Sequence, residues 1–307
     1  MELERFYAFR VVAQTENISR AAELMHVSQP ALSQTIRRLE EDWNCPLFDR
    51  DGRRIRLNRA GKILLAAVEE IDDVLDRARM TLAEEAGRPP VISLYIGCAS
   101  MLLPELLHFL RSRTPEVSYQ LFQWSGAAPN PGADLHIVAV PGNAGETSEC
   151  LMQEPIGLAL PAGHPLLQKE QISLYDLMNE EMISLNPEWE LYNVTSRALE
   201  AASFTPRITT WVDNPNLLRD LLRMGMGLAF VPLVSWRAFA GEEVFLRPLA
   251  DCTIRREIYL VHRQGKTPPK AVLDCMEGIR IFFRHQVETA DCAEFSQFFS
   301  KNYPSEK

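Results

Sequence analysis

Hydrophobic residues recur at helical spacing in two short segments near the N-terminus, with only a few polar residues between them. The first segment, SRAAELM, starts at Ser19, and the second, PALSQTIRRLEEDW, starts at Pro30. One side of the second helix is predicted to pack inward through four apolar residues: Leu32, Ile36, Leu39 and Trp43. Two short helices joined by a small turn predict a helix-turn-helix, which places one helix in a DNA major groove.

The opposite side of the second helix is polar. Ser28 is placed to cap this helix, and Pro30 lies in its first turn, where the missing N–H costs nothing. The residues on this side are Gln29, Pro30, Ser33, Gln34 and Arg37. Amide groups suit the adenine edge and a guanidinium suits the guanine edge, so this side is predicted to read bases. The alternative is that this side of the helix is an ordinary solvated surface. DNA binding is favoured by the complete motif of two helices and a turn, not by this side alone.

An arginine-rich segment follows the second helix. Between residues 50 and 59 there are five arginines and one acidic residue, Asp51. Charged and apolar residues alternate from Arg54 to Leu57, which predicts a short strand with Ile55 and Leu57 inward and the arginines outward. Such a wing contacts phosphates. The predicted DNA-binding residues are therefore Ser28, Gln29, Pro30, Ser33, Gln34, Arg37, Arg38, Arg50, Arg53, Arg54 and Arg56.

The charge of the chain is unevenly distributed. Its net charge is −9 and its pI is about 5.3, which alone would argue against a nucleic-acid partner. Residues 1–60, however, hold ten arginines and nine acidic residues, so the acidic excess lies in the remainder of the chain. Affinity for DNA is therefore expected to be local and dependent on salt, and two DNA-binding arms in one assembly would strengthen it.

Residues 1–87 resemble the DNA-binding module and linker helix of the LysR-type transcriptional regulators. The resemblance is long and ungapped, and it rests on Ala21-Ala22, Val27-Ser28-Gln29-Pro30, Arg38-Leu39-Glu40, Pro46-Leu47-Phe48 and Ala60-Gly61. It implies a transcriptional regulator that binds double-stranded DNA. Trp43, Cys45 and Asn58 depart from the residues usual in the family, but Asn58 can still cap the helix that follows.

A long amphipathic helix is predicted from Arg59 to Ala86, ending before Gly87. Its apolar residues recur in alternating steps of four and three: Leu64, Val68, Ile71, Leu75, Ala78 and Leu82. Acidic residues crowd the other side, so the helix has one narrow apolar face. Pairing of two such helices in a homodimer or homotetramer is expected, as the resemblance also implies. Packing of this helix on its own domain is the alternative.

Beyond Pro90 the pattern changes to apolar strands that alternate with helices. Strands are predicted at 91–97, 118–124, 135–140, 156–161, 182–185, 207–212, 228–232 and 257–262, and helices at 104–111, 174–178, 192–202, 217–224 and 270–283. This alternation predicts an α/β fold with a largely parallel sheet, in two subdomains around a cleft, with the last helix packed on the first subdomain. More loosely than the N-terminus, this half resembles the family's effector-binding domain, which is similar in plan to periplasmic binding proteins.

The predicted organisation has four parts. These are a winged helix-turn-helix domain at 1–58, a linker helix at 59–88, an effector-binding domain at 91–290 and a C-terminal tail at 291–307. The effector-binding domain is divided into subdomain I, at 91–161 and 266–290, and subdomain II, at 162–265. Ser125–Ala133 is too short and too rich in Pro and Gly for the helix that the family usually has there. An alternative function for the C-terminal half is therefore oligomerisation alone.

Ligands in open α/β sheets bind beyond the carboxyl ends of strands, near helix N-termini. The residues predicted at such positions, and hence as effector contacts, are Cys98, Ser100, Met101, Val140, Asn186, Trp189 and Asn214. Ser100 and Asn214 are the best candidates for hydrogen bonds to a small molecule, and plain helix capping is an equal alternative for each. Thiol sensing through Cys98 is a further alternative.

Other functional classes find little support in the sequence. The six cysteines include no CxxC pair and no metal-ligand spacing, and no secretory signal is present, so reduced thiols in a cytoplasmic protein are expected. The histidines are scattered along the chain and the GxG at 225–227 is isolated, so neither an enzyme nor a bound cofactor is predicted. No run of 18 apolar residues predicts a membrane span. The sequence predicts a DNA-binding regulator that responds to a small-molecule effector, with no catalytic or metal-binding residues.

Overall fold

The structure is a computed structural model that describes residues 2–51, 54–123, 133–142, 145–263 and 268–291. The chain divides after Pro90 into two compact units, an N-terminal unit and a C-terminal unit that begins at Val91. Each unit has its own hydrophobic core.

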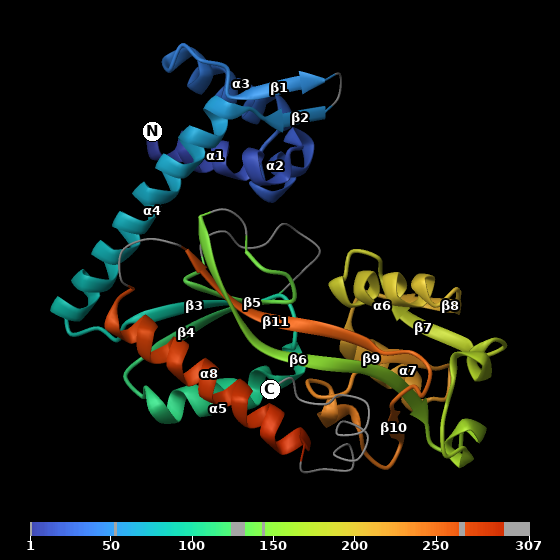
Figure 1. Ribbon diagram of the computed structural model, residues 1–307. Helices are drawn as coiled ribbons and strands as arrows, with labels where there is room; N and C mark the ends of the chain where they lie inside the picture. The colour runs from blue at the N-terminus through green and yellow to red at the C-terminus, as the bar shows by residue number, and fades with distance from the viewer. Residues whose placement is uncertain (1, 52–53, 124–132, 143–144, 264–267, 292–307) are drawn as a thin grey trace, which may run out of the picture. The chain divides into compact units, whose positions relative to one another are not determined.

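The N-terminal unit packs helices and a small hairpin around one core (Figure 1). Its elements are α1 (Glu2–Thr15), α2 (Ile18–Leu24), α3 (Gln29–Asp42), β1 (Phe48–Asp51), β2 (Arg54–Leu57) and α4 (Arg59–Glu85). Phe9 of α1 and Ile36 of α3 are fully buried in this core, and Phe48 of the hairpin stacks against Phe9 with ring centroids 5.6 Å apart. The predicted helix-turn-helix and wing strand are confirmed.

The inward side of α3 differs from the prediction at one residue. Leu32, Ile36 and Leu39 are buried as expected, but Trp43 is 52% exposed. The helix ends at Asp42, and Trp43 forms its C-cap, where its ring meets only the edge of Phe6. Because Trp43 lies beyond the last helical residue, the spacing that placed it on the buried stripe no longer applies.

The long helix α4 ends one residue earlier than predicted, and the Asn58 side chain caps it by accepting a hydrogen bond from the Gly61 N–H at 2.9 Å. The predicted apolar seam is wrong in its first part, because Leu64 and Val68 are buried in the core of the N-terminal unit. The apolar residues that α4 leaves exposed lie on a side of the helix that is rotated from the predicted seam. It comprises Ile63, Ala67, Ile71, Val74, Ala78 and Leu82, which we call the α4 stripe.

The C-terminal unit is built on a curled mixed sheet with the strand order β10-β6-β11-β5-β3-β4, and β9 also pairs with β6 (Figure 1). Its strands are β3 (Val91–Ile96), β4 (Ser118–Gln123), β5 (Leu135–Val138), β6 (Glu146–Pro161), β9 (Ala229–Pro232), β10 (Val244–Arg247) and β11 (Ile254–Arg263). A separate two-stranded sheet consists of β7 (Glu181–Leu185) and β8 (Arg207–Val212).

Helices cover these sheets. They are α5 (Leu103–Arg113), α6 (Glu190–Ala201), α7 (Pro215–Arg223) and α8 (Lys270–Asp291), with short 3-10 turns at Ser100–Leu102, Pro165–Gln168, Leu174–Leu177 and Arg237–Phe239. The C-terminal helix α8 packs against α5 so closely that a Cβ on Gly278 would lie 2.7 Å from Leu110 Cδ2. The prediction that this helix returns to the first half of the unit is therefore confirmed.

The expected largely parallel sheet is wrong. Parallel pairs form where a helix connects the strands, as in β3–α5–β4 and β7–α6–β8, and also between β3 and β5. The 16-residue strand β6 pairs antiparallel with β9, β10 and β11. The strand β11 also pairs antiparallel with β5, and the alternation of apolar residues does not reveal the direction of these strands.

The predicted boundary between subdomains, 161/162, falls at the end of β6, after its last pairs with β9 and β10. The division into subdomains stays a prediction. The helix-free segment predicted at Ser125–Ala133 lies outside the described residues except for Ala133, which is buried.

Candidate DNA-binding face and effector-domain sites

The exposed side of α3 begins at a capped helix end. The Ala31 N–H donates to Ser28 Oγ at 3.4 Å, and Pro30 occupies the first turn, as the sequence predicts. Gln29, Gln34 and Arg37 are exposed, whereas Ser33 is half-buried. Arg38 is exposed as well. One helix thus buries its apolar side in the core and presents amide and guanidinium groups to solvent.

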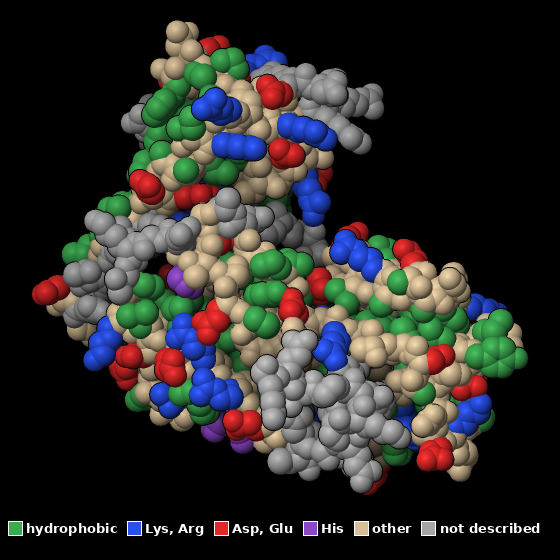
Figure 2. Space-filling view, in the orientation of Figure 1, with side chains coloured by type: hydrophobic (Ala, Val, Ile, Leu, Met, Phe, Trp, Pro, Cys, Tyr) green, Lys and Arg blue, Asp and Glu red, His purple; other side chains and the backbone are tan. Residues whose placement is uncertain are grey.

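The wing is a hairpin in which β1 pairs antiparallel with β2, and Arg56 lies opposite Asp49. Ile55 is buried, Leu57 is half-buried and its N–H donates to Glu16 Oε1 at 3.0 Å, while Arg56 is exposed. Arg53 and the side chains of Arg50 and Arg54 lie outside the described residues. Figure 2 shows Lys and Arg side chains gathered on one face of the N-terminal unit, with a few acidic ones between them.

In the C-terminal unit, the segment after β3 turns sharply. Ala99 adopts a left-handed conformation (φ 54°) between the buried Cys98 and the 3-10 turn that starts at Ser100. Met101 then packs against the same core cluster as Trp189, which precedes α6. Met101 and Trp189 thus pack against one cluster, and Cys98 lies near Glu190, the residue after Trp189.

The other predicted effector contacts have local roles. Asn214 caps α7 by accepting the Asn216 N–H at 2.7 Å, which is the capping alternative. The backbone N–H of Asn186 donates to the Val212 carbonyl at 2.8 Å. Val140 is 57% exposed and takes no part in the core cluster around Met101 and Trp189.

A buried ion pair lies beside Cys98, and the sequence did not predict it. Arg256 of β11 donates through Nε to Glu154 Oε1 of β6 at 2.6 Å. The Ser235 N–H and hydroxyl donate to the two Glu154 oxygens at 2.7 and 3.0 Å, and Arg256 Nη2 donates to Ser235 Oγ at 3.0 Å. Both strands carry further charged residues, such as Glu149 on β6 and Arg255 on β11, so the sequence gives no distinct signal for this pair.

Glu190, the first residue of α6, adds a second carboxylate to this cluster. Both of its carboxylate oxygens are buried, and neither has a hydrogen-bond partner among the described residues. Burial raises the pKa of Glu190 to about 7, Arg256 opposes the rise and Glu154 adds to it. Burial likewise raises the pKa of the Cys98 thiol to about 12. The cluster therefore holds one paired carboxylate, one unpaired carboxylate and a protonated thiol.

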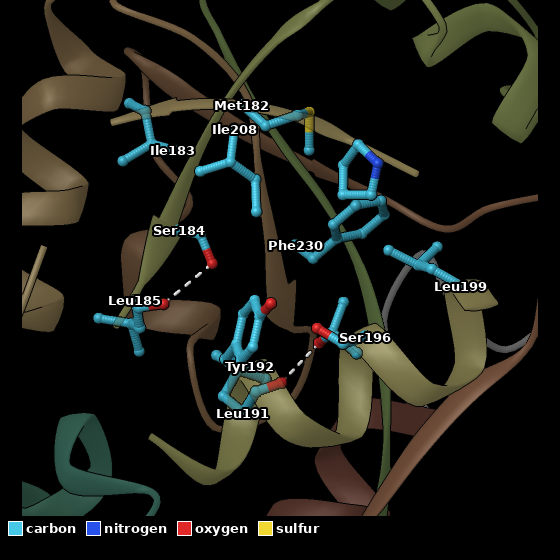
Figure 3. Close-up of a pocket in the computed structure, with 12 residues that line it drawn as sticks. Met182, Ile183, Ser184, Leu185, Leu191, Tyr192, Ser196, Leu199, Ile208 and Phe230 are labelled. Carbon is cyan, nitrogen blue, oxygen red and sulfur yellow. Dashed lines mark hydrogen bonds between the residues drawn. The ribbon is translucent and has the colours of Figure 1, made fainter. Parts of the chain in front are cut away.

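A pocket of about 400 Å³, including its open mouth, lies between α6 and strands β7, β8 and β9 (Figure 3). It is lined by Met182, Ile183, Ser184, Leu185, Leu191, Tyr192, Thr195, Ser196, Leu199, Pro206, Ile208 and Phe230. None of the predicted effector contacts lines it. The lining residues give no sequence signal of their own, since they follow the ordinary apolar pattern of a helix packed on a sheet.

Neither a membrane span nor a metal site is found among the described residues. No helix in that part of the chain is long and apolar enough to cross a membrane. No group of three or more His, Cys, Asp or Glu side chains there is arranged to hold a metal ion.

Two family profiles match the chain. Residues 3–62 match the bacterial regulatory helix-turn-helix protein, lysR family, and residues 91–283 match the LysR substrate binding domain. A probable RuBisCO transcriptional regulator of Trichormus variabilis is 28% identical over 290 residues, covering 88% of this chain and 85% of that protein.

Solved structures share the fold. A full-length OxyR variant from Pseudomonas aeruginosa is 22% identical with a TM-score of 0.60, covering 92% of this chain and 95% of that one. Full-length CbnR in complex with its target DNA is 22% identical with a TM-score of 0.55, covering 92% of this chain and 99% of that one.

Proposed function

This chain belongs to the LysR family of bacterial transcriptional regulators, and we propose that it reads operator DNA with the exposed side of α3. It is a regulator with a DNA-binding helix-turn-helix domain and an effector-binding domain. The observation that carries the proposal is the capped start of α3, beyond which Gln34 and Arg37 stand exposed while Ile36 is buried. Helix N-terminal residues of this kind contact base edges in the major groove.

The wing supplies the second part of the proposed DNA contact. Arg56 is exposed on β2, and its neighbour Ile55 anchors the strand in the core. Arginines held on such a hairpin bind phosphates and set the register of α3 along the duplex. The complex of CbnR with its target DNA has the same fold, which supports this arrangement.

We propose that the effector binds near Cys98, Ser100, Met101 and Trp189. Cys98 and Ser100 follow the carboxyl end of β3, and Trp189 is the residue immediately before α6. Strand ends facing a helix N-terminus are where ligands bind in α/β folds. The thiol-sensing alternative is less favoured, because a thiol with a pKa of about 12 holds almost no reactive thiolate at neutral pH.

The α4 stripe supports assembly of two copies. Val74 and Leu82 are 56% and 67% exposed, although they are apolar and lie on the same side of one helix. We propose that two copies of the chain pair along this stripe, in a dimer or tetramer, and so present two helix-turn-helix domains to one operator. A small molecule that binds one arrangement of the pair better than another would then alter the contact with DNA.

The proposed place of action is the cytoplasm, where a bacterial regulator meets DNA. No catalytic role is proposed, since the relatives are transcriptional regulators.

The substitution Arg37→Ala tests the role of α3. It should weaken binding to the operator by about 1–3 kcal/mol and relax the preference at one base pair, because one bidentate contact is lost. Measurement of affinity across a randomised operator library gives both quantities. The matched control is Arg111→Ala, an exposed arginine of the C-terminal unit, which should bind as the wild type does. Unchanged affinity and base preference for Arg37→Ala would show that α3 does not read DNA.

A further inference from the structure

An ion pair inside the N-terminal unit joins the DNA-binding helices to the long helix α4. Arg10 of α1 is only 6% exposed, and its neighbours Phe9 and Val11 belong to the apolar core. Its Nη1 donates to a carboxylate oxygen of the half-buried Asp72 on α4, and its Cζ lies 5.2 Å from the centre of the Tyr7 ring. The Arg10 Nε is buried without a hydrogen-bond partner among the described residues. The guanidinium is therefore held in place but not fully satisfied.

Asp72 continues the side of α4 that faces the domain. Leu64 and Val68 are buried in the core of the N-terminal unit, and Asp72 follows Val68 by four residues, so these side chains lie one turn apart on the same side. Figure 1 shows α4 passing α1 and continuing beyond it. From Asp72 to Glu85 the helix is about 20 Å long, so a swing of about 10° at Asp72 moves its far end by about 3 Å.

The energetics of such a pair favour a role in geometry over a role in stability. Removal of a guanidinium and a carboxylate from water costs much of what their attraction returns, and apolar residues of similar volume often give an equally stable protein. The unpartnered Nε of Arg10 adds to that cost. A guanidinium, however, presents its N–H groups in a fixed plane, so it holds a carboxylate in a defined direction. Apolar side chains pack together with less dependence on direction.

We propose that Arg10 and Asp72 are positioning residues that set the separation of the two DNA half-sites read by a pair of chains. This inference rests on the proposed pairing along the α4 stripe and on the proposed reading of bases by α3. In such a pair, the angle between α1 and α4 places the two α3 helices relative to each other. Each added base pair turns the second half-site by about 35° around the duplex. A fixed angle therefore selects one separation, whereas a loose angle accepts several.

The test measures binding of the full-length chain to duplexes that carry one half-site in inverted repeat. The wild-type protein selects the half-site from random DNA, and its two copies are separated by about 3 to 14 base pairs, which covers one turn of the duplex. The wild type should prefer one separation at least about tenfold, and Arg10→Met/Asp72→Leu should reduce this preference to about threefold or less. Affinity for a duplex with a single half-site should stay unchanged, since neither residue belongs to the proposed DNA-binding face. The urea midpoint should not fall, because no buried charge remains.

A second ion pair of α1 provides the matched control. Arg5→Met/Asp42→Leu removes the pair between α1 and the last residue of α3, in which α4 takes no part, and should keep the wild-type preference. Asp72→Asn removes one charge at nearly constant volume and should lower the preference in the same direction, which answers the question even if the double variant folds poorly.

Three results would overturn the inference. They are a wild-type preference in both Asp72 variants, an equal loss of preference in the control pair, and a wild type that binds one half-site but accepts all separations equally. In each of them α3 still reads DNA. A wild type that selects no half-site from random DNA would instead contradict the proposed function, and this inference with it.

Discussion

Glu154 and Arg256 form an ion pair in the interior of the C-terminal unit, with Oε1 and Nε 2.6 Å apart and exposures of 0% and 5%. The two residues lie on adjacent long strands and are 102 positions apart in the sequence. Ser235 contacts both of them, so Glu154 and Arg256 each have hydrogen-bonded partners. Glu154 and Arg256 are also register partners in the antiparallel pairing of β6 with β11, so the ion pair joins these two strands.

Removal of one member of this pair should be strongly destabilising. Glu154→Leu leaves the buried Arg256 guanidinium without its counter-ion, and the free energy of unfolding should fall by about 3–5 kcal/mol in urea titrations. The double variant Glu154→Leu/Arg256→Met should recover most of this loss, because no buried charge remains. Glu181→Gln breaks the exposed pair with Arg207 and serves as the control, with an expected loss below about 1 kcal/mol. A small effect of Glu154→Leu would mean that water solvates Arg256.

The unpaired carboxylate of Glu190 should make stability depend on pH. Its pKa is raised from 4.5 to about 7, so the folded protein binds this proton more tightly than the unfolded chain. The free energy of unfolding should therefore fall as pH rises between those two values, by up to about 3 kcal/mol, and remain low above them. Glu190→Gln should remove this fall and stabilise the protein at pH 8. Urea unfolding at pH 5 and pH 8, with the exposed neighbour Glu188→Gln as control, measures the difference. Equal pH profiles for wild type and Glu190→Gln would contradict the assignment.

The wing should contribute affinity without sequence preference. Arg56→Ala should weaken binding to specific and random DNA alike, and the slope of log K against log salt should decrease in magnitude by about 1. Titrations at several salt concentrations on both DNAs give the slope. Arg111→Ala again controls for the loss of an arginine elsewhere, and an unchanged slope for Arg56→Ala would exclude a phosphate contact.

A charge on the α4 stripe should separate the copies. Val74→Glu places a carboxylate within an apolar contact, at a cost of about 3 kcal/mol, which corresponds to a roughly 100-fold weaker dimer. Sedimentation velocity over a range of protein concentrations measures this change. Lys62→Glu lies on the opposite side of α4, is exposed, and should leave assembly unchanged. If Val74→Glu assembles as well as the wild type, another surface holds the copies together.

The sequence by itself determined the N-terminal unit almost completely. The Ser28 cap, the buried Ile36, the wing strand at 54–57 and the Asn58 cap depend on interactions between residues close together in the chain. Helical spacing and capping report such local interactions directly. The exception in α3, Trp43, lies where the helix ends, and periodicity does not mark that end.

Tertiary structure decided what local patterns leave open. Leu64 and Ile63 are neighbours on α4, yet Leu64 is buried in the core and Ile63 is exposed, because α1 and β2 pack against only one side of the helix. In the C-terminal unit, strand positions followed from apolar alternation, but strand direction did not. The Glu154–Arg256 pair, the unpaired Glu190 and the pocket beneath α6 all depend on residues that meet only after distant segments pack, and no spacing along the chain encodes those meetings.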